Sequence, residues 1–182
     1  MKKQILLLVM ALVITVGLKA QFTGATLQAS GLTCAMCTKA IDNALHQLPF
    51  VASVKPDIKN SSFNIIFKEG VTPDIDGLQK AVEDAGFSVS KLKLTGNFNN
   101  ISIKNDEHVS IGGKEFHFVN VSSQVLNGEK VLIIVDKNFL SPKEFKKISS
   151  ATSMSCLQTG KAGDCCSKAG VAAGTRIYHV TI

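Results

Sequence analysis

The spacing of apolar residues between positions 25 and 94 constrains the fold most. It changes repeatedly from a period of two to a period of about 3.6. Period-two segments predict half-buried strands, and segments with the longer period predict amphipathic helices. The order that results is strand, helix, strand, strand, helix, strand. This pattern predicts a compact α+β unit over residues 21–95.

Each predicted element is marked by a short set of apolar positions. Gly31 ends the first strand, Pro49 ends the first helix and Gly86 ends the second helix. The positions that carry the pattern are Leu27 and Ala29 for the first strand, Ile41, Ala44, Leu45 and Leu48 for the first helix, Val54, Ile58, Phe63, Ile65 and Phe67 for a hairpin, Ile75, Leu78, Val82 and Ala85 for the second helix, and Leu92 and Leu94 for the last strand.

Two cysteines follow the first strand and are separated by two residues. Cys34 falls in the loop, and Cys37 falls where the first helix begins. Unpaired N–H groups and the helix dipole should favour negative charge on these sulfurs, and the thiolate is the metal-binding form. A two-thiolate site suits a soft ion such as Cu(I), whereas structural zinc usually has four protein ligands. The spacing therefore predicts an open soft-metal site.

The segment around these cysteines resembles the Gly-Met-Thr-Cys-x-x-Cys signature of heavy-metal-associated domains. That family includes copper chaperones, domains of metal ATPases and periplasmic mercury-binding proteins. The matching segment reads Gly31-Leu32-Thr33-Cys34-Ala35-Met36-Cys37. Leu32 replaces the usual methionine and should preserve its packing, since the two side chains have similar volumes. Phe87 falls where the family carries an aromatic residue or a lysine near the metal.

The resemblance implies a ferredoxin-like fold with Cys34 and Cys37 as metal ligands. Cu(I) is the first expectation for the ion, and Hg(II), Ag(I), Zn(II) and Cd(II) remain alternatives because they accept the same ligands. A thioredoxin-like redox pair and a structural disulfide are alternative interpretations of the two cysteines. Covalent haem attachment is excluded, because Thr38 stands where a histidine is required.

The sequence changes character near residues 95–97, where we place the boundary of a second region, residues 96–182. Strand patterns predominate there, at 98–103, 109–111, 116–121, 131–135 and 176–182. One helix is predicted from Ser141, with Pro142 at its first position and Glu144 completing a capping box. Short strands with a single helix before the last strand suggest a small mostly-β domain, such as an oligonucleotide/oligosaccharide-binding (OB) barrel.

Three more cysteines, Cys156, Cys165 and Cys166, lie between that helix and the last strand. Their segment is rich in small and polar residues, so we expect a loop outside the core. Two interpretations stay open: a disulfide from Cys156 to one of the other two, or a second thiol-rich metal site. His117 alternates with two phenylalanines and is expected to face solvent, and no pattern involves His108 or His179.

The N-terminus is typical of a signal peptide. Lys2 and Lys3 precede an apolar run over residues 5–18, and Ala20 offers a cleavage site. The alternative is an uncleaved N-terminal anchor.

Removing residues 1–20 deletes three lysines, which leaves 20 − 3 = 17 basic and 14 acidic residues. The basic residues are scattered, which argues against nucleic acid as a partner, and nothing in the mature chain is apolar enough to span a membrane.

We therefore expect an exported, periplasmic protein that is not an enzyme. It would capture Cu(I) or a related thiophilic ion and either pass it to a partner protein or sequester it. One alternative function is a thiol-disulfide oxidoreductase that uses Cys34 and Cys37 together with the C-terminal cysteines. Another is an interaction module, in which the C-terminal region docks a partner and the metal domain acts as a sensor.

Overall fold

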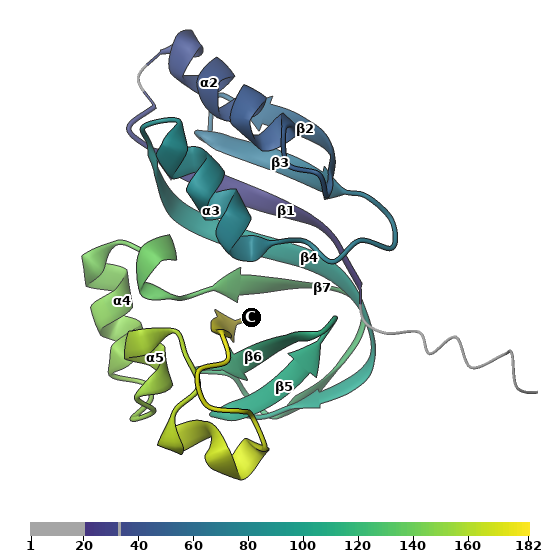
Figure 1. Cartoon of the computed structure of the whole chain (residues 1–182), viewed down its shortest axis with the longest axis vertical. Coiled ribbons are helices and arrows are strands. Elements are labelled where there is room, and N and C mark those ends of the chain that lie inside the picture. Colours follow the sequence, from purple (N-terminus) through teal and green to yellow (C-terminus); the bar gives the residue numbers. More distant parts are fainter. Residues whose placement is uncertain (1–20, 33) are drawn as a thin grey trace, which may run out of the picture.

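The structure, a computed structural model, describes residues 21–32 and 34–182, so the predicted signal peptide lies outside the described residues. The first elements are β1 (Gln21–Ser30), α2 (Ala35–His46), β2 (Val51–Asp57), β3 (Ser62–Phe67), α3 (Ile75–Asp84) and β4 (Ser88–Ile103). Their strands lie in the order β2-β3-β1-β4, and every neighbouring pair is antiparallel. Figure 1 shows α2 and α3 side by side on one face of these strands. This is the predicted ferredoxin-like arrangement.

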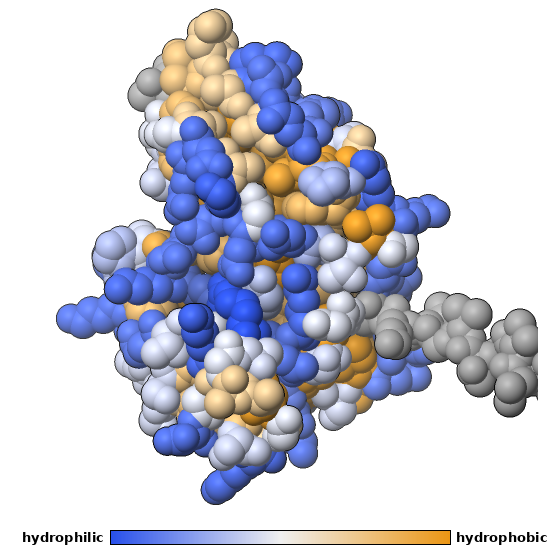
Figure 2. All heavy atoms as spheres, viewed as in Figure 1, coloured by the Kyte–Doolittle hydropathy of each residue, from blue (hydrophilic) through white to orange (hydrophobic). Residues whose placement is uncertain are grey.

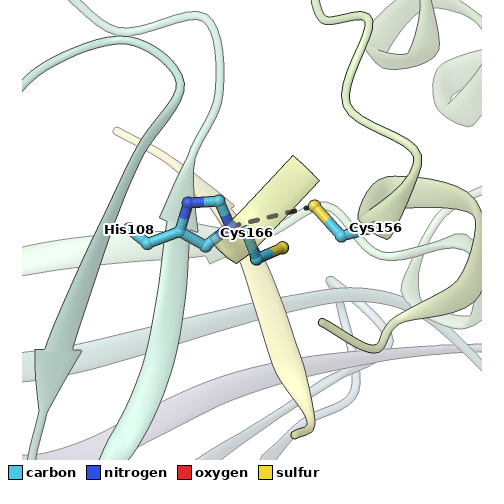
Figure 3. A group of neighbouring side chains, drawn as sticks. All are labelled: His108, Cys156 and Cys166. Atoms are coloured by element: carbon cyan, nitrogen blue, oxygen red, sulfur yellow. Dashed lines mark hydrogen bonds between the residues drawn. The ribbon is translucent and has the colours of Figure 1, made fainter. Parts of the chain in front are cut away.

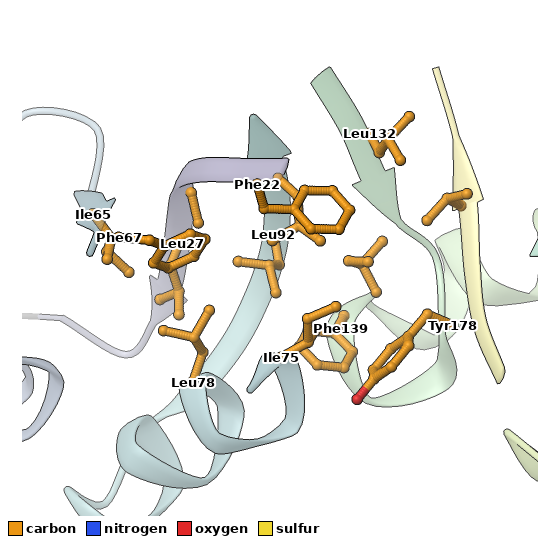
Figure 4. Packing of buried hydrophobic residues seen from close by; sticks show 14 of the residues in the cluster. Phe22, Leu27, Ile65, Phe67, Ile75, Leu78, Leu92, Leu132, Phe139 and Tyr178 are labelled. Carbon is orange, nitrogen blue, oxygen red and sulfur yellow. The ribbon is translucent and has the colours of Figure 1, made fainter. Parts of the chain in front are cut away.

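The apolar stripes of strands and helices meet in one core, as the period analysis requires. Leu27, Phe63 and Leu92 come from three neighbouring strands and are fully buried. Ile75 and Leu78 of α3 lie on the same side as Leu27 and Leu92, as Figure 4 shows, and belong to the same core. Burying each such side chain contributes about 1.5–3 kcal/mol, so this face holds the strands and helices together.

The second region contains β5 (Glu107–Ile111), β6 (Lys114–Phe118), β7 (Gln124–Ile134), the 3-10 helix η1 (Lys137–Phe139), α4 (Pro142–Ser149), α5 (Cys156–Thr159), the 3-10 helix η2 (Asp164–Ala169) and β8 (Ile177–Thr181). Its mostly-β character is confirmed. The capping box of α4 is also present, because the Glu144 N–H donates to Ser141 Oγ at 3.4 Å and the Ser141 N–H donates to Glu144 Oε2 at 3.2 Å.

The second region does not form a closed barrel of its own. Its strands continue the first sheet, and the full order is β2-β3-β1-β4-β7-β8-β6-β5, with β2 and β5 at the edges. The joint is β4, which pairs with β1 along its first half and with β7 from Leu92 to Ile103. β4 therefore runs through residues 95–97 without a break. The division of the chain into units at that point stays a prediction.

Side chains from both regions pack against each other. The Phe22 ring of β1 lies 5.5 Å from the Phe116 ring of β6, and Phe116 lies 5.7 Å from the ring of Tyr178 in β8. Arg176 donates to Asp76 of α3 and to Asp136, which precedes η1. The two regions thus share apolar packing and an ion-pair network. Over residues 21–32 and 34–182, none of the helices is long and apolar enough to cross a membrane.

Candidate metal centre

Cys34 and Cys37 lie together at the N-terminus of α2. Cys34 is the N-cap residue, with an extended backbone, and its sulfur accepts the Cys37 backbone N–H at 3.3 Å. The two Sγ atoms are 2.7 Å apart. The sulfur of Cys34 thus takes the place of the usual N-cap oxygen, at the positive end of the helix dipole. The predicted meeting of a loop sulfur and a first-turn sulfur is confirmed.

The strand and loop before the pair fix its position. Gly31 ends β1 with a φ of 82°, a conformation that side-chain-bearing residues rarely adopt, so glycine is needed to turn the chain toward Cys34. Leu32 is partly buried against the core, as its replacement of methionine predicted. Phe87 is also partly buried and lies next to Gly31, at the base of the same loop.

The surface around the pair is open. Cys34 is exposed, and the neighbouring Met36 has an exposed fraction of 79%. Figure 2 shows mildly apolar atoms gathered at this tip of the molecule, over the start of α2. The ammonium group of Lys39 forms an ion pair with the carboxylate of Asp42 at 3.0 Å. Its positive charge is therefore paired with that carboxylate and not with the two sulfurs. The tip can therefore be reached by another molecule.

Residues 26–88 match the family of the heavy-metal-associated domain. A stretch of 66 residues is 35% identical to copper-transporting ATPase 1 of Rhizobium meliloti (strain 1021). Residues 26–88 form a heavy-metal-associated domain. The match to the ATPase covers 36% of this chain but only 8% of the ATPase, so this chain spans a small part of that relative's length.

Two solved structures are similar to the heavy-metal-associated domain. Oxidized MerP from Ralstonia metallidurans CH34 is 27% identical, with a TM-score of 0.34, over 39% of this chain and 94% of that one. The CopZ metallochaperone is 21% identical, with a TM-score of 0.33, over 38% of this chain and 97% of that one. Each similarity covers less than two fifths of this chain.

The three C-terminal cysteines do not lie in a polar surface loop, so that expectation is wrong. Cys156 and Cys166 are buried, with exposed fractions of 1% and 0%, in a small apolar cluster with Ala162 and Ile177. Cys165 is partly buried, and its sulfur lies 3.5 Å from that of Cys166. All three are free thiols, and neither proposed partner of Cys156 is disulfide-bonded to it. The segment packs inward, and two of its cysteines lie against His108, His117 and His179 on one face of β5, β6 and β8.

His117 is buried, with an exposed fraction of 0%, and this contradicts the expectation that it faces solvent. Strand alternation correctly placed His117 on the other face of β6 from Phe116 and Phe118, but that face is buried as well. His117 pairs in register with His108 of β5 and with His179 of β8. The three imidazoles therefore form one row on the face that the cysteine segment covers, an arrangement that sequence spacing did not reveal.

Burial disfavours the charged forms of His117 and Cys156 on this face, whereas Cys165 differs. Burial, reinforced by the nearby His179 and His108, lowers the pKa of His117 to about 4. Burial also raises the pKa of the Cys156 thiol, with a further contribution from Cys165 and Cys166. Burial would raise the pKa of Cys165 as well, but hydrogen bonds from the Ser155 hydroxyl and the Cys156 N–H outweigh it and lower that pKa to about 7.

Proposed function

We propose that this chain is an exported metal carrier that captures Cu(I), or a related thiophilic ion, through Cys34 and Cys37. The observation that carries the proposal is that two thiols, one of them exposed, lie together at a helix N-terminus. Two sulfur ligands leave the coordination of the ion open, and soft thiolates suit Cu(I) and related thiophilic ions. The copper-transporting ATPase that resembles this domain supports copper as the cargo.

The exposure of the pair supports transfer to a partner rather than permanent storage. A partner's thiolate can approach Cys34 directly, bind the ion, and displace first one sulfur and then the other. Met36 and its mildly apolar surroundings offer a small surface against which such a partner can dock. In this proposal the domain is a binding module, not an enzyme.

Export is the second part of the proposal. It is supported by the basic start, the apolar run and Ala20. Mass spectrometry of protein from the periplasmic fraction should give a mature N-terminus at Gln21. An unprocessed N-terminus in the membrane fraction would instead favour the anchor.

The decisive test is Cu(I) uptake by the reduced chain and by Cys34→Ser/Cys37→Ser, measured by competition with a chromogenic Cu(I) chelator. Serine at position 34 still provides an N-cap acceptor, so α2 should persist while the soft ligands are lost. We expect one Cu(I) fewer per chain in the double variant. Met36→Leu is the matched control: it alters the rim of the site without touching a thiolate, and its uptake should equal that of the wild type. Unchanged uptake in the double variant would refute the proposal.

The closeness of the two sulfurs also suits a reversible disulfide, so a thiol-disulfide oxidoreductase is the second candidate. An enzyme of this kind should reduce a protein disulfide such as that of insulin at a rate that depends on both cysteines. The carrier that we propose should show no such activity above that of Cys34→Ser/Cys37→Ser. Turnover by the wild type alone would favour the oxidoreductase.

A further inference from the structure

Five metal-ligating side chains from five separate elements converge on the face of the second region that α5 and η2 cover. Three of them appear in Figure 3. The five are His108 of β5, His117 of β6, Cys156 of α5, Cys166 of η2 and His179 of β8. We call them the His/Cys cluster. It lies outside the heavy-metal-associated domain and shares no residue with the Cys34 and Cys37 pair.

Two sulfur–nitrogen distances in the cluster are close to those of a coordination shell. Cys156 Sγ lies 3.8 Å from His108 Nε2 and 3.8 Å from His117 Nδ1. The ligand atoms of His117, Cys156 and His179 lie within 4.8 Å of one another, as do those of His108, Cys156 and Cys166. In a tetrahedral site with ordinary zinc bond lengths, a sulfur and an imidazole nitrogen are separated by about 3.6 Å. Cys156 belongs to both groups and is their common ligand.

Two carboxylates orient the imidazoles for this purpose. Asp106 Oδ1 lies 3.2 Å from His117 Nε2, and Asp136 Oδ1 lies 2.5 Å from His179 Nδ1. Each carboxylate accepts the ring N–H, so the other nitrogen of each ring keeps its lone pair. In His117 that nitrogen is Nδ1, which faces Cys156. A carboxylate behind a ligating histidine is a recurrent feature of protein metal sites.

The remaining nitrogen of His179 points to a missing ligand. His179 is fully buried, and among the described residues its Nε2 makes no hydrogen bond. A buried polar atom without a partner is unfavourable, so native structures rarely leave one unsatisfied. A cation held between Nε2 of His179, Nδ1 of His117 and the sulfur of Cys156 would satisfy all three atoms at once.

A catalytic interpretation fits the same residues less well. Cys156 contacts His117, and His117 contacts Asp106, in the order of a nucleophile, a general base and a carboxylate that orients the base. A nucleophile must meet its substrate, however, and Cys156 has an exposed fraction of 1%, while His117 is completely buried. A small ion needs no such access, so the burial that argues against catalysis is compatible with metal binding.

We propose that the His/Cys cluster is a second metal site, in which His117, His179 and Cys156 bind a transition-metal ion of the zinc and copper class. The fourth ligand comes from His108 or Cys166, which both approach Cys156. Mixed imidazole and thiolate ligands suit Zn(II) and copper and exclude the hard ions Mg²⁺ and Ca²⁺. The proposal does not depend on the function of the Cys34 and Cys37 pair.

The test uses the full chain carrying Cys34→Ser/Cys37→Ser, so that the first pair cannot contribute. After reduction, the chain is reconstituted separately with Zn(II), Co(II) and Cu(I). We expect one ion per chain and, for Co(II), the thiolate charge-transfer and visible bands of a tetrahedral site. Comparing the Zn(II) and Cu(I) affinities identifies the ion. Absence of uptake of all three ions would overturn the proposal.

Three further substitutions in that background locate the ligands. Cys156→Ser should abolish the thiolate-to-cobalt band if His108 is the fourth ligand, and should reduce it to about half if Cys166 is. Cys165→Ser, which changes a neighbouring cysteine outside both ligand groups, should preserve the band. Asp106 has a backbone φ of 57°, a left-handed conformation that asparagine also tolerates. Asp106→Asn keeps the size of the side chain and removes its negative charge. It should weaken binding by about 10–100-fold. Circular dichroism confirms folding of each variant. An unchanged cobalt spectrum in Cys156→Ser would contradict the assignment.

Discussion

The two cysteine-containing sites of this chain differ in exposure and in origin. The Cys34 and Cys37 pair lies on an exposed tip and comes from one loop and one helical turn. The His/Cys cluster is buried and comes from five elements. Figure 1 places the start of α2 at one end of the long axis, and β5 and α5 toward the other. Exposure suits an ion that is exchanged, and burial suits an ion that is retained.

Metal exchange offers the sharpest test of this contrast. A chain loaded at both proposed sites and challenged with excess chelator should release its metal in two phases. The fast phase should disappear completely in Cys34→Ser/Cys37→Ser, since only the exposed pair is open to direct attack by the chelator. The slow phase should disappear in Cys156→Ser. If both ions leave at one rate, burial does not separate the two sites.

A second test asks whether the regions that carry the two sites fold together. Phe22→Ala removes a buried ring that packs against both Phe98 and Phe116, and it should reduce the free energy of unfolding by about 3–5 kcal/mol. Far-UV circular dichroism and the fluorescence of Tyr178 should report the same shifted denaturation midpoint.

The matched control for that substitution is Ile58→Ala. The Ile58 side chain has an exposed fraction of 73%, so its loss should change stability by no more than about 0.5 kcal/mol. Two separate transitions, with only one moved by Phe22→Ala, would show that the regions unfold independently and would support the predicted domain boundary.

Acid sensitivity should reveal the ion-pair network between the regions. Burial tends to raise the pKa of Asp76, but the hydrogen bonds and positive charge of Arg176 outweigh it, and the pKa lies below its ordinary value. The stabilisation from the ionised form is therefore present above about pH 4 and is lost as the pH falls through the lowered pKa. Asp76→Asn should be less stable than the wild type at pH 7, and the difference should shrink at low pH. A difference that does not vary with pH would exclude this linkage.

The smallest expected effect concerns the cap of α2. Cys34→Ser should leave the free energy of unfolding within about 0.5 kcal/mol of the wild type, because a hydroxyl replaces the sulfur as the N-cap acceptor. Cys34→Ala removes the acceptor and should cost about 1 kcal/mol. Thermal denaturation of the metal-free proteins measures both. Equal stability of the two variants would mean that the sulfur does not cap the helix.

The sequence by itself determined the first unit and its metal pair. Strand and helix periods are local properties, and Cys34 and Cys37 are only three residues apart at a helix start, so their proximity follows from the chain's local geometry. The same reasoning predicted the capping box of α4. In the cysteine pair and in the capping box, the residues that interact are close together in the sequence.

Only the tertiary structure decided how the second region is arranged and what its histidines do. Alternation places His117 on the opposite face from Phe116, but it cannot show that a segment some 40 residues later covers that face. The row of His108, His117 and His179 depends on β5, β6 and β8 being neighbours in one register. Strand pairing joins residues that are distant in the sequence, and the spacing of residues along the chain does not encode it.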